Sequence, residues 1–353
     1  MDITQEIKTS KLDYPLPQDR IAQRPVEPRD HSRLLVYNRN TGEMVHTFFY
    51  ELSRFLKKGD VLVINDTKVI PARITARTIP TEGKVEILLL KPIDESRNLW
   101  EALVRPGRKA RGGREFVCSS GSSLLKGRFE GKTDKGSYLL SLDRRTDEVL
   151  AFLEEAGDMP LPPYIHQPVT KPSDYQTVFA KDPGSVAAPT AGFHFTERLI
   201  DELKSKGILF ASVTLHIGWA TFKPITAETL QQHQMDVEFF RLPEETAQIL
   251  RECWTRGNKV VAVGTTSVRT LESCAPAVHQ VESQSGWTGL YITPGYQFKA
   301  VDALITNFHL PRSSNLALVA AFIGDIGRTL QIYQEAIHQG YRFYSFGDAM
   351  LIL

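Results

Sequence analysis

The sequence predicts an α/β protein with a barrel-like large domain and a small inserted antiparallel β domain that is also barrel-like. Strand patterns alternate with helix patterns from about residue 161 onward, which is typical of a parallel sheet or distorted barrel. Segment 74–142 instead carries short β runs separated by Gly, Asp, Lys and Ser. The 353 residues, 42% of them hydrophobic, suffice for two cores. We expect the large domain to comprise 1–73 and 143–353, and the small domain 74–142.

Composition excludes several classes of protein. The 42 Lys and Arg residues against 41 Asp and Glu give a net charge of +1, so no global basic field points to nucleic acid. Cys118, Cys253 and Cys274 lie far apart, which argues against a zinc ribbon, an iron–sulfur cluster and a disulfide framework. No apolar run is long enough to cross a membrane, and the N-terminus lacks a signal-peptide pattern. We expect a cytoplasmic protein without a membrane partner.

The first predicted elements lie near the N-terminus. Four prolines interrupt 12–32, so we expect this segment to cover a surface before a strand formed by LLVY. Arg29 and Arg33 offer planar guanidinium groups suited to phosphate or carboxylate, although solvated arginines fit equally well. A buried strand, DVLVI, then leads into polar residues that include Asp66, and the segment closes at Arg73. Such polar positions often contact ligands in α/β folds, but a plain Asn-Asp turn is the simpler alternative.

The predicted small domain carries a basic loop. Its sequence, RPGRKARGGR (105–114), has five basic residues and no acidic one. A Gly-rich loop of this kind can contact an RNA backbone, and a solvated hairpin loop explains it equally well. The candidate RNA-binding residues are Arg105, Arg108, Lys109 and Arg111. A helix over 146–156 and a Pro-rich bridge follow.

The stretch GSVAAPTAGFHFT (184–196) is expected to be a close-fitting loop around which the site is organised. Its small residues let the backbone approach a ligand, while Pro and Gly resist regular structure. Thr196 is expected to cap a helix that begins at Glu197 and stops at Gly207. This places His194 at a helix N-terminus. The alternative is a buried linker whose histidine satisfies a carbonyl group.

A second histidine, His216, is expected at the carboxyl end of a strand over 208–217. A helix over 244–256 and a buried strand over 259–263 come next. Both patterns continue the strand–helix alternation that predicts the large domain.

The turn GTTSVRTLES, which begins at Gly264, is a candidate anion site. Free backbone N–H groups, the hydroxyls of Thr265 and Thr266, and Arg269 suit a carboxylate at least as well as a phosphate. The sequence has neither GxxxxGK[ST] nor GxGxxG here. An ordinary capped helix explains one hydroxyl but does not require three followed by arginine.

The C-terminal part is expected to add a strand over 290–298, a strand ending at Asn307, and two helices over 314–323 and 325–338 before a final apolar strand. Phe308 and His309 follow the second of these strands. Parallel strands end at one edge of their sheet. We therefore expect four candidate site residues to share that edge: His194, His216, Arg269 and His309.

Taken together, the motifs resemble those of the S-adenosylmethionine:tRNA ribosyltransferase-isomerase family of queuosine biosynthesis. The resemblance spans nearly the whole chain, in IAQRPVEPRDHSRLLV, NDTKVIPAR, MPLPPYI, GSVAAPTAGFHFT, VTLHIGWATFKP, VGTTSVRTLES, ITPGYQF, LITNFHLPRSS and YRFYSFGDAML. It implies transfer of the ribosyl unit of S-adenosylmethionine onto 7-aminomethyl-7-deazaguanine at the tRNA wobble position. The products implied are epoxyqueuosine, adenine and methionine. The chain departs from the family pattern at Ala220, Gly289, Arg312 and Ser313–Asn315, and none of these changes removes a candidate histidine.

This reaction requires a base near the sulfonium, an acid for departing adenine and exclusion of water. The candidate catalytic residues are His194, His216 and His309, and their acid and base roles stay open. The candidate substrate-binding residues are Arg33, Asp66, Arg73, Phe193, Phe195, Thr265, Thr266, Arg269, Tyr296, Asn307 and Phe308. Aromatic faces could hold the sulfonium, and the Thr265–Arg269 turn could hold the methionine carboxylate.

S-adenosylmethionine is expected to be a consumed substrate, so we expect no cofactor and no metal. We expect a monomer that acts on tRNA. A metal-dependent hydrolase is one rival, although no HExxH-like pair occurs. A non-catalytic RNA-binding module is the other, and only the basic loop supports it.

Overall fold

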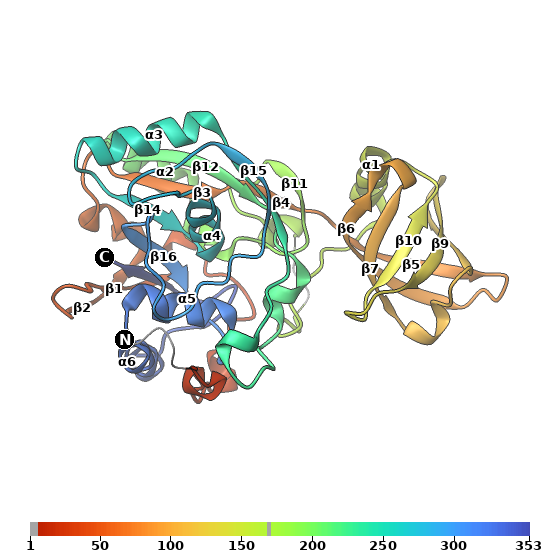
Figure 1. Cartoon of the computed structure of the whole chain (residues 1–353), viewed down its shortest axis with the longest axis horizontal. Coiled ribbons are helices and arrows are strands. Elements are labelled where there is room, and N and C mark those ends of the chain that lie inside the picture. The colour runs from red at the N-terminus through yellow and green to blue at the C-terminus, as the bar shows by residue number, and fades with distance from the viewer. Residues whose placement is uncertain (1–5, 168–170) are drawn as a thin grey trace. The chain divides into compact units, whose positions relative to one another are not determined.

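The computed structural model describes residues 6–167 and 171–353, which divide into two compact units (Figure 1). The large unit contains the chain up to Thr67 together with Pro163–Asp182 and Ala188–Leu353. The small unit contains Lys68–Pro162 and Pro183–Ala187. The small unit thus extends beyond the β runs of 74–142 on both sides.

The large unit is built on one nine-stranded sheet with the order β15-β13-β12-β3-β14-β16-β17-β1-β2. Its strands are β1 (Arg33–Tyr37), β2 (Met44–Phe48), β3 (Val61–Asn65), β12 (Leu209–Leu215), β13 (Glu238–Leu242), β14 (Val260–Val263), β15 (Gln284–Thr288), β16 (Ala303–Asn307) and β17 (Ala349–Ile352). The four neighbours β12, β3, β14 and β16 run parallel, whereas β13, β15 and β2 pair antiparallel. The sheet is therefore mixed, and its carboxyl edge is formed by central strands.

Both faces of the central strands are buried. Leu62, Val261 and Ile305 belong to one hydrophobic cluster, against which α2 (Glu197–Ser205) packs with Leu199. The residues that alternate with these along the same strands point to the other face of the sheet. They are also fully or almost fully buried, among them Val63, Ala262 and Leu304. Near-continuous apolar strands of this kind are typical of parallel sheets covered on two sides.

The helices begin and end close to where the sequence predicts. They are α1 (Thr146–Ala156), α2, α3 (Glu244–Thr255), α4 (Thr265–Ser273), α5 (Ser314–Ile323) and α6 (Ile326–His338). Thr196 caps α2 by accepting a hydrogen bond from the Leu199 N–H group at 3.2 Å. Ser313 and Asp325 cap α5 and α6 in the same way. Local capping signals therefore fixed these helix starts.

The small unit contains a closed six-stranded antiparallel barrel with the order β10-β7-β6-β5-β8-β9 (Figure 1). Its strands are β5 (Arg73–Ile79), β6 (Lys84–Asp94), β7 (Leu99–Arg105), β8 (Glu115–Ser120), β9 (Ser123–Lys132) and β10 (Tyr138–Leu142). Alternate residues point inward, among them the buried Phe116 and Phe129, whose rings are 4.9 Å apart. The α/β class and the inserted antiparallel β barrel are thus confirmed.

The sheet of the large unit begins at β15 and ends at β2, so it is open in the described residues. One expectation about this unit needs correction. The strand expected over 290–298 lies earlier, at β15, where QSGWT pairs with β13. The short strands β4 (Thr67–Val69) and β11 (Asp182–Ser185) form a separate two-stranded sheet.

Within the described chain, no single helix has the length and apolar character needed to cross a membrane. Only α5 and α6 taken together meet that test of length and composition, and they are bent by 109° at the break between them.

Candidate active site

The carboxyl edge of the parallel strands brings distant polar side chains together. Asn65, the last residue of β3, donates from its amide to the Leu215 carbonyl at 3.0 Å and to Thr266 Oγ1 at 3.1 Å. These bonds join the ends of β3 and β12 to the first turn of α4. Parallel topology therefore brings the ends of these strands together with the start of α4 at one edge of the sheet.

The part of the loop that belongs to the large unit, from Ala188 to Thr196, lies against the same edge. It contains one 3-10 turn, η8 (Thr190–His194), and Thr190 Oγ1 donates to Asn307 Oδ1 at 3.0 Å. A Cβ atom on Gly264 would stand 3.5 Å from the Cβ of Ala191, so the loop also approaches the start of α4. Gly264 has φ +90°, a conformation that favours glycine.

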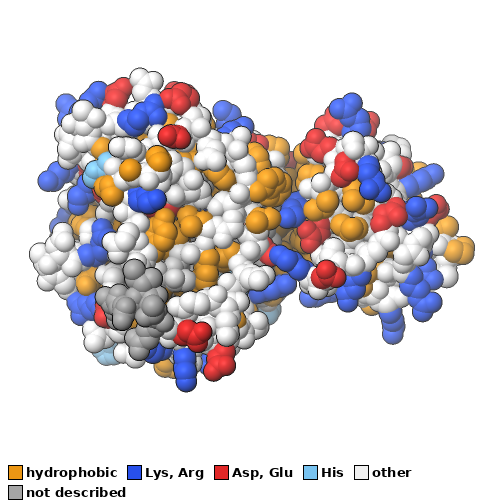
Figure 2. Space-filling view, viewed as in Figure 1, with side chains coloured by type: hydrophobic (Ala, Val, Ile, Leu, Met, Phe, Trp, Pro, Cys, Tyr) orange, Lys and Arg blue, Asp and Glu red, His pale blue; other side chains and the backbone are white. Residues whose placement is uncertain are grey.

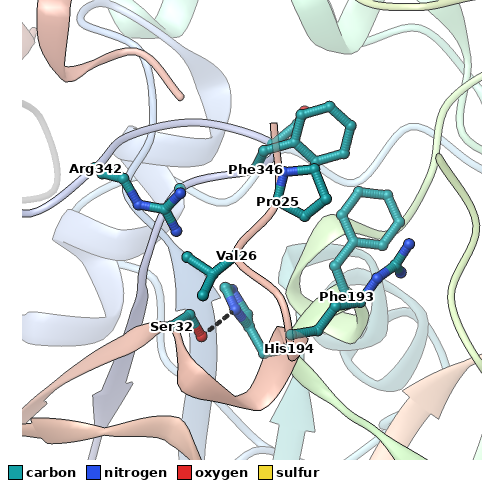
Figure 3. Close-up of a pocket in the computed structure, with 10 residues that line it drawn as sticks. Pro25, Val26, Ser32, Phe193, His194, Arg342 and Phe346 are labelled. Carbon is teal, nitrogen blue, oxygen red and sulfur yellow. Dashed lines mark hydrogen bonds between the residues drawn. The ribbon is translucent and has the colours of Figure 1, made fainter. Parts of the chain in front are cut away.

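His194 is buried, and both of its ring nitrogens are hydrogen-bonded. Asn307 Nδ2 donates to the Tyr344 carbonyl while Asn307 Oδ1 accepts from Thr190, which fixes the orientation of the amide. Nδ2 therefore also donates to His194 Nε2, at 3.2 Å. The ring proton then lies on Nδ1, which donates to Ser32 Oγ at 2.7 Å (Figure 3).

The surroundings keep His194 neutral. Burial, followed by the positive charges of Arg342 and Arg29, lowers its pKa from 6.5 to about 3. At neutral pH the imidazole is therefore uncharged, and its Nε2 lone pair accepts the 3.2 Å hydrogen bond from Asn307.

This pKa predicts a pH dependence of stability. The unfolded histidine binds a proton near pH 6.5 and the folded one only near pH 3, so unfolding takes up a proton between these values. The free energy of unfolding should therefore fall on acidification by about 1.4 kcal/mol per pH unit because of His194. Urea titrations from pH 7 to 4.5 should show a shallower fall for His194→Gln. Parallel curves for the two proteins would contradict the shift.

His194 lines a small pocket in the large unit (Figure 3). Its lining comprises Pro25, Val26, Arg29, Ser32, Phe193, His194, Arg342, Ser345, Phe346 and Gly347. Figure 3 places the Phe193 and Phe346 rings close to each other, and their centroids are 5.7 Å apart at an angle of 25°. The pocket's cavity volume is about 10 Å³, close to the roughly 10–15 Å³ that a single water molecule needs. A ligand end larger than a water molecule therefore requires the pocket to widen.

Two arginines place positive charge in this pocket. Among the described residues, Arg29 donates to three main-chain carbonyls, of which Gln176 at 2.7 Å is the nearest, and its guanidinium lies 5.2 Å from the Phe193 ring centre. Burial lowers the pKa of Arg29, so a bound anion would stabilise its charged form. Arg342 pairs with Asp348 at 3.2 Å. Sequence analysis noted Arg29 without selecting it and missed Arg342, Ser32 and Phe346, although all four lie in the motifs that carry the family resemblance.

Thr265 and Thr266 lie where predicted, in the first turn of α4. Thr265 Oγ1 donates to Asn315 Oδ1 at 3.1 Å, and Thr266 accepts from Asn65. In the described residues α4 has no side-chain cap, so its first N–H groups keep their affinity for an anion.

Arg269 is buried and fully engaged within the protein. Its guanidinium forms an ion pair with Glu238, itself buried, and donates to the carbonyls of Leu290 and Thr288. Glu238 also accepts from the Gly218 N–H group at 2.7 Å. The fork predicted to hold a methionine carboxylate is thus occupied by a protein carboxylate, which corrects the expected geometry.

The other two candidate histidines lie in different surroundings. His216 follows β12, and its Nδ1 is 2.8 Å from Thr67 Oγ1. His309 Nε2 is 2.7 Å from Thr306 Oγ1. Burial is the main cause that lowers the pKa of both, to about 3 for His309. Neither lines the pocket at His194.

The predicted aromatic contacts divide into pocket and core positions. Phe193 lines the pocket, whereas Phe195 and Phe308 are completely buried against other rings. Tyr296 donates to Glu272 at 3.1 Å. Because Glu272 lies seven residues beyond Thr265, this contact is about 10 Å along α4 from its N-terminus.

Three further candidates are engaged elsewhere. The Arg33 guanidinium lies over the Tyr341 ring at 3.9 Å. Asp66 accepts from Thr214 Oγ1 at 2.7 Å. Arg73 belongs to the small unit, where it pairs with Glu86 at 3.3 Å.

The basic loop follows β7 of the small unit. Arg105, Arg108 and Arg111 are exposed, and Lys109 donates to the Lys84 carbonyl at 3.1 Å. Figure 2 shows several Lys and Arg side chains projecting from this unit. Across residues 6–167 and 171–353, no group of three or more His, Cys, Asp or Glu side chains could hold a metal ion.

Comparisons with known proteins agree with this arrangement. A family model described as a queuosine biosynthesis protein matches residues 9–352. A protein of Moorella thermoacetica named S-adenosylmethionine:tRNA ribosyltransferase-isomerase is 49% identical over 98% of this chain and 100% of its own. A relative of that name from Thermotoga maritima is also 49% identical, with the same coverage.

A solved structure supports the same relationship. The crystal structure of the S-adenosylmethionine tRNA ribosyltransferase from Thermotoga maritima matches 98% of this chain and 100% of its own, with 41% identity and a TM-score of 0.56. The chain therefore belongs to the S-adenosylmethionine:tRNA ribosyltransferase-isomerase family of queuosine biosynthesis.

Proposed function

We propose that this chain transfers and isomerises the ribosyl moiety of S-adenosylmethionine onto 7-aminomethyl-7-deazaguanine at the tRNA wobble position. The products are epoxyqueuosine-tRNA, adenine and methionine. The family match over 9–352 carries this proposal. Incubation with labelled S-adenosylmethionine and precursor tRNA should release adenine and methionine, and release without precursor tRNA would argue against ribosyl transfer.

The methionine end of S-adenosylmethionine binds in the pocket beside His194. Arg29 and Arg342 supply the positive charge that a carboxylate requires, and the pocket must widen to admit the ligand. Phe193 is a candidate contact for the sulfonium because it lines the pocket, but its ring already packs against Phe346 and the Arg29 guanidinium, which would have to move. Thr265, Thr266 and Asn307 stay substrate-binding candidates because they lie at the same strand edge.

His194 is the proposed proton acceptor. The positive charges of Arg29 and Arg342 contribute to the lowered pKa of His194. A bound carboxylate would neutralise them, so substrate binding raises the basicity of His194. The accepting atom is Nε2, because Nδ1 already carries the ring proton that it donates to Ser32. His216 and His309 are the candidates for protonating adenine.

The chain works as a cytoplasmic monomer without a cofactor, since S-adenosylmethionine is consumed. Sedimentation of the protein with and without tRNA tests the monomer. Activity of protein freed of metal by chelation tests whether S-adenosylmethionine and tRNA suffice.

The basic loop of the small unit binds the tRNA backbone. Replacing Arg105, Arg108 and Arg111 with Ser should weaken tRNA binding and reduce the slope of log affinity against log salt by up to about three. Arg97 and Arg145 provide the control, because they are also exposed but lie near the opposite end of β7. If replacing Arg97 and Arg145 with Ser reduces the salt slope by as much for each charge removed, tRNA binding is not specific to the basic loop.

A further inference from the structure

Three rings form a continuous row on one face of the large sheet. Trp287 of β15 lies directly opposite Phe239 of β13, with ring centres 5.9 Å apart at 75°. Phe239 in turn stacks on His216, with centres 5.5 Å apart at 24°. We call Trp287, Phe239 and His216 the aromatic row. It leads from an edge strand to a histidine at the carboxyl edge of the sheet.

The face that carries the aromatic row is accessible. Along β13, Glu238, Phe240 and Leu242 are buried, whereas Phe239 is partly exposed and Arg241 is exposed. Trp287 is 55% exposed. A tryptophan exposed to this extent on an edge strand contributes little to the core, which indicates a binding surface.

The exposure also decides the kind of ligand. Small-molecule sites are concave and bury most of the ligand. A row of rings that ends in an exposed tryptophan cannot enclose a ligand in this way. Unpaired RNA bases, in contrast, bind by stacking on open aromatic side chains. Arg241 stands two residues from Phe239 on the same face, with its side chain 46% exposed and its guanidinium paired with Asp182. It adds a cationic group beside the row, and every base in an RNA strand is flanked by phosphates that such a group can contact.

We propose that the aromatic row is a stacking platform for an unpaired base of the tRNA anticodon loop, next to the nucleotide that is modified. The inference rests on the proposed function, which supplies the RNA substrate. A π face accepts any base, so the platform holds the loop open without reading its sequence. Because the row ends at His216, a base stacked on Trp287 positions its neighbour toward the strand edge.

Two RNAs of equal length and charge test this platform: an anticodon stem–loop and a fully paired duplex. Trp287→Ala should weaken binding of the stem–loop by roughly 5- to 150-fold and leave duplex binding unchanged. Trp287→Phe, which keeps a π face, should retain most of the affinity. The salt dependence should keep its slope, because no phosphate contact is lost.

Phe48→Ala is the matched control, since Phe48 is 43% exposed on β2, the strand at the other end of the sheet order. It should leave both affinities unchanged. Unaltered stem–loop binding by Trp287→Ala, or equal losses for stem–loop and duplex, would overturn the platform. A changed sedimentation coefficient would instead assign Trp287 to an interface between copies of the chain. Adenine release by the wild-type protein is measured separately, so failure of the proposed function is distinguishable from failure of the platform.

Discussion

Replacing His194 with Gln is expected to lower turnover by about 10² to 10⁴ while changing S-adenosylmethionine affinity little. Glutamine can reproduce both contacts of the ring, donating to Ser32 and accepting from Asn307. It cannot accept a proton at neutral pH. Single-turnover adenine release and equilibrium binding of S-adenosylmethionine separate loss of chemistry from loss of binding.

The competing interpretation of His194 is structural, since the ring is buried and hydrogen-bonded on both sides. In that case His194→Gln should lower the melting temperature and leave turnover of the folded protein intact. Near-normal chemistry would transfer proton acceptance to His216 or His309. Ser32→Ala serves as the control for geometry, because it removes the Nδ1 partner without removing the base.

Local signals predicted much of the fold from the sequence. The Thr196 cap and the Gly207 stop frame α2, and apolar strands such as β3 and β14 are buried on both faces. β15 was placed wrongly because QSGWT is polar and Gly-containing. Its pairing with β13, rather than its own propensity, makes it a strand.

The candidate site was predictable only where topology determines it. At one edge of the sheet, Asn65 meets Thr266 and Asn307 meets Thr190, and the alternation of strands and helices predicts that edge. Sequence could not separate Phe193, which lines the pocket, from Phe195, which is core, because both flank the same histidine. This choice depends on packing partners far along the chain.

The sequence also could not predict which charged side chains lie next to each other in the folded protein. Arg29 and Arg342 are more than 300 residues apart and meet only in the folded pocket. Arg269 lies in a turn whose sequence predicts an anion site, but in the structure its guanidinium is paired with Glu238 of β13. A sequence motif shows which functional group a position supplies. It does not show which partner that group binds in the folded protein.

Removing one partner of the Arg269–Glu238 pair is expected to lower the free energy of unfolding by about 3–5 kcal/mol, because the other charge stays buried and uncompensated. Arg269→Met and Glu238→Gln should each have this effect in urea titrations. Combining Arg269→Met with Glu238→Leu removes both charges and should recover most of the loss. Such recovery would identify Arg269 as a residue that positions β13 against α4.

The same variants decide whether Arg269 holds the methionine carboxylate. If it does, Arg269→Met should weaken S-adenosylmethionine binding by roughly 1–3 kcal/mol and leave decarboxylated S-adenosylmethionine unaffected. The double variant would then be stable yet still bind the intact ligand poorly. If Arg269 only pairs with Glu238, Arg269→Met should change the affinities for both ligands equally. The double variant should then bind both ligands with wild-type affinity. Carboxylate recognition then belongs to Arg29 and Arg342, whose guanidinium groups line the pocket beside His194.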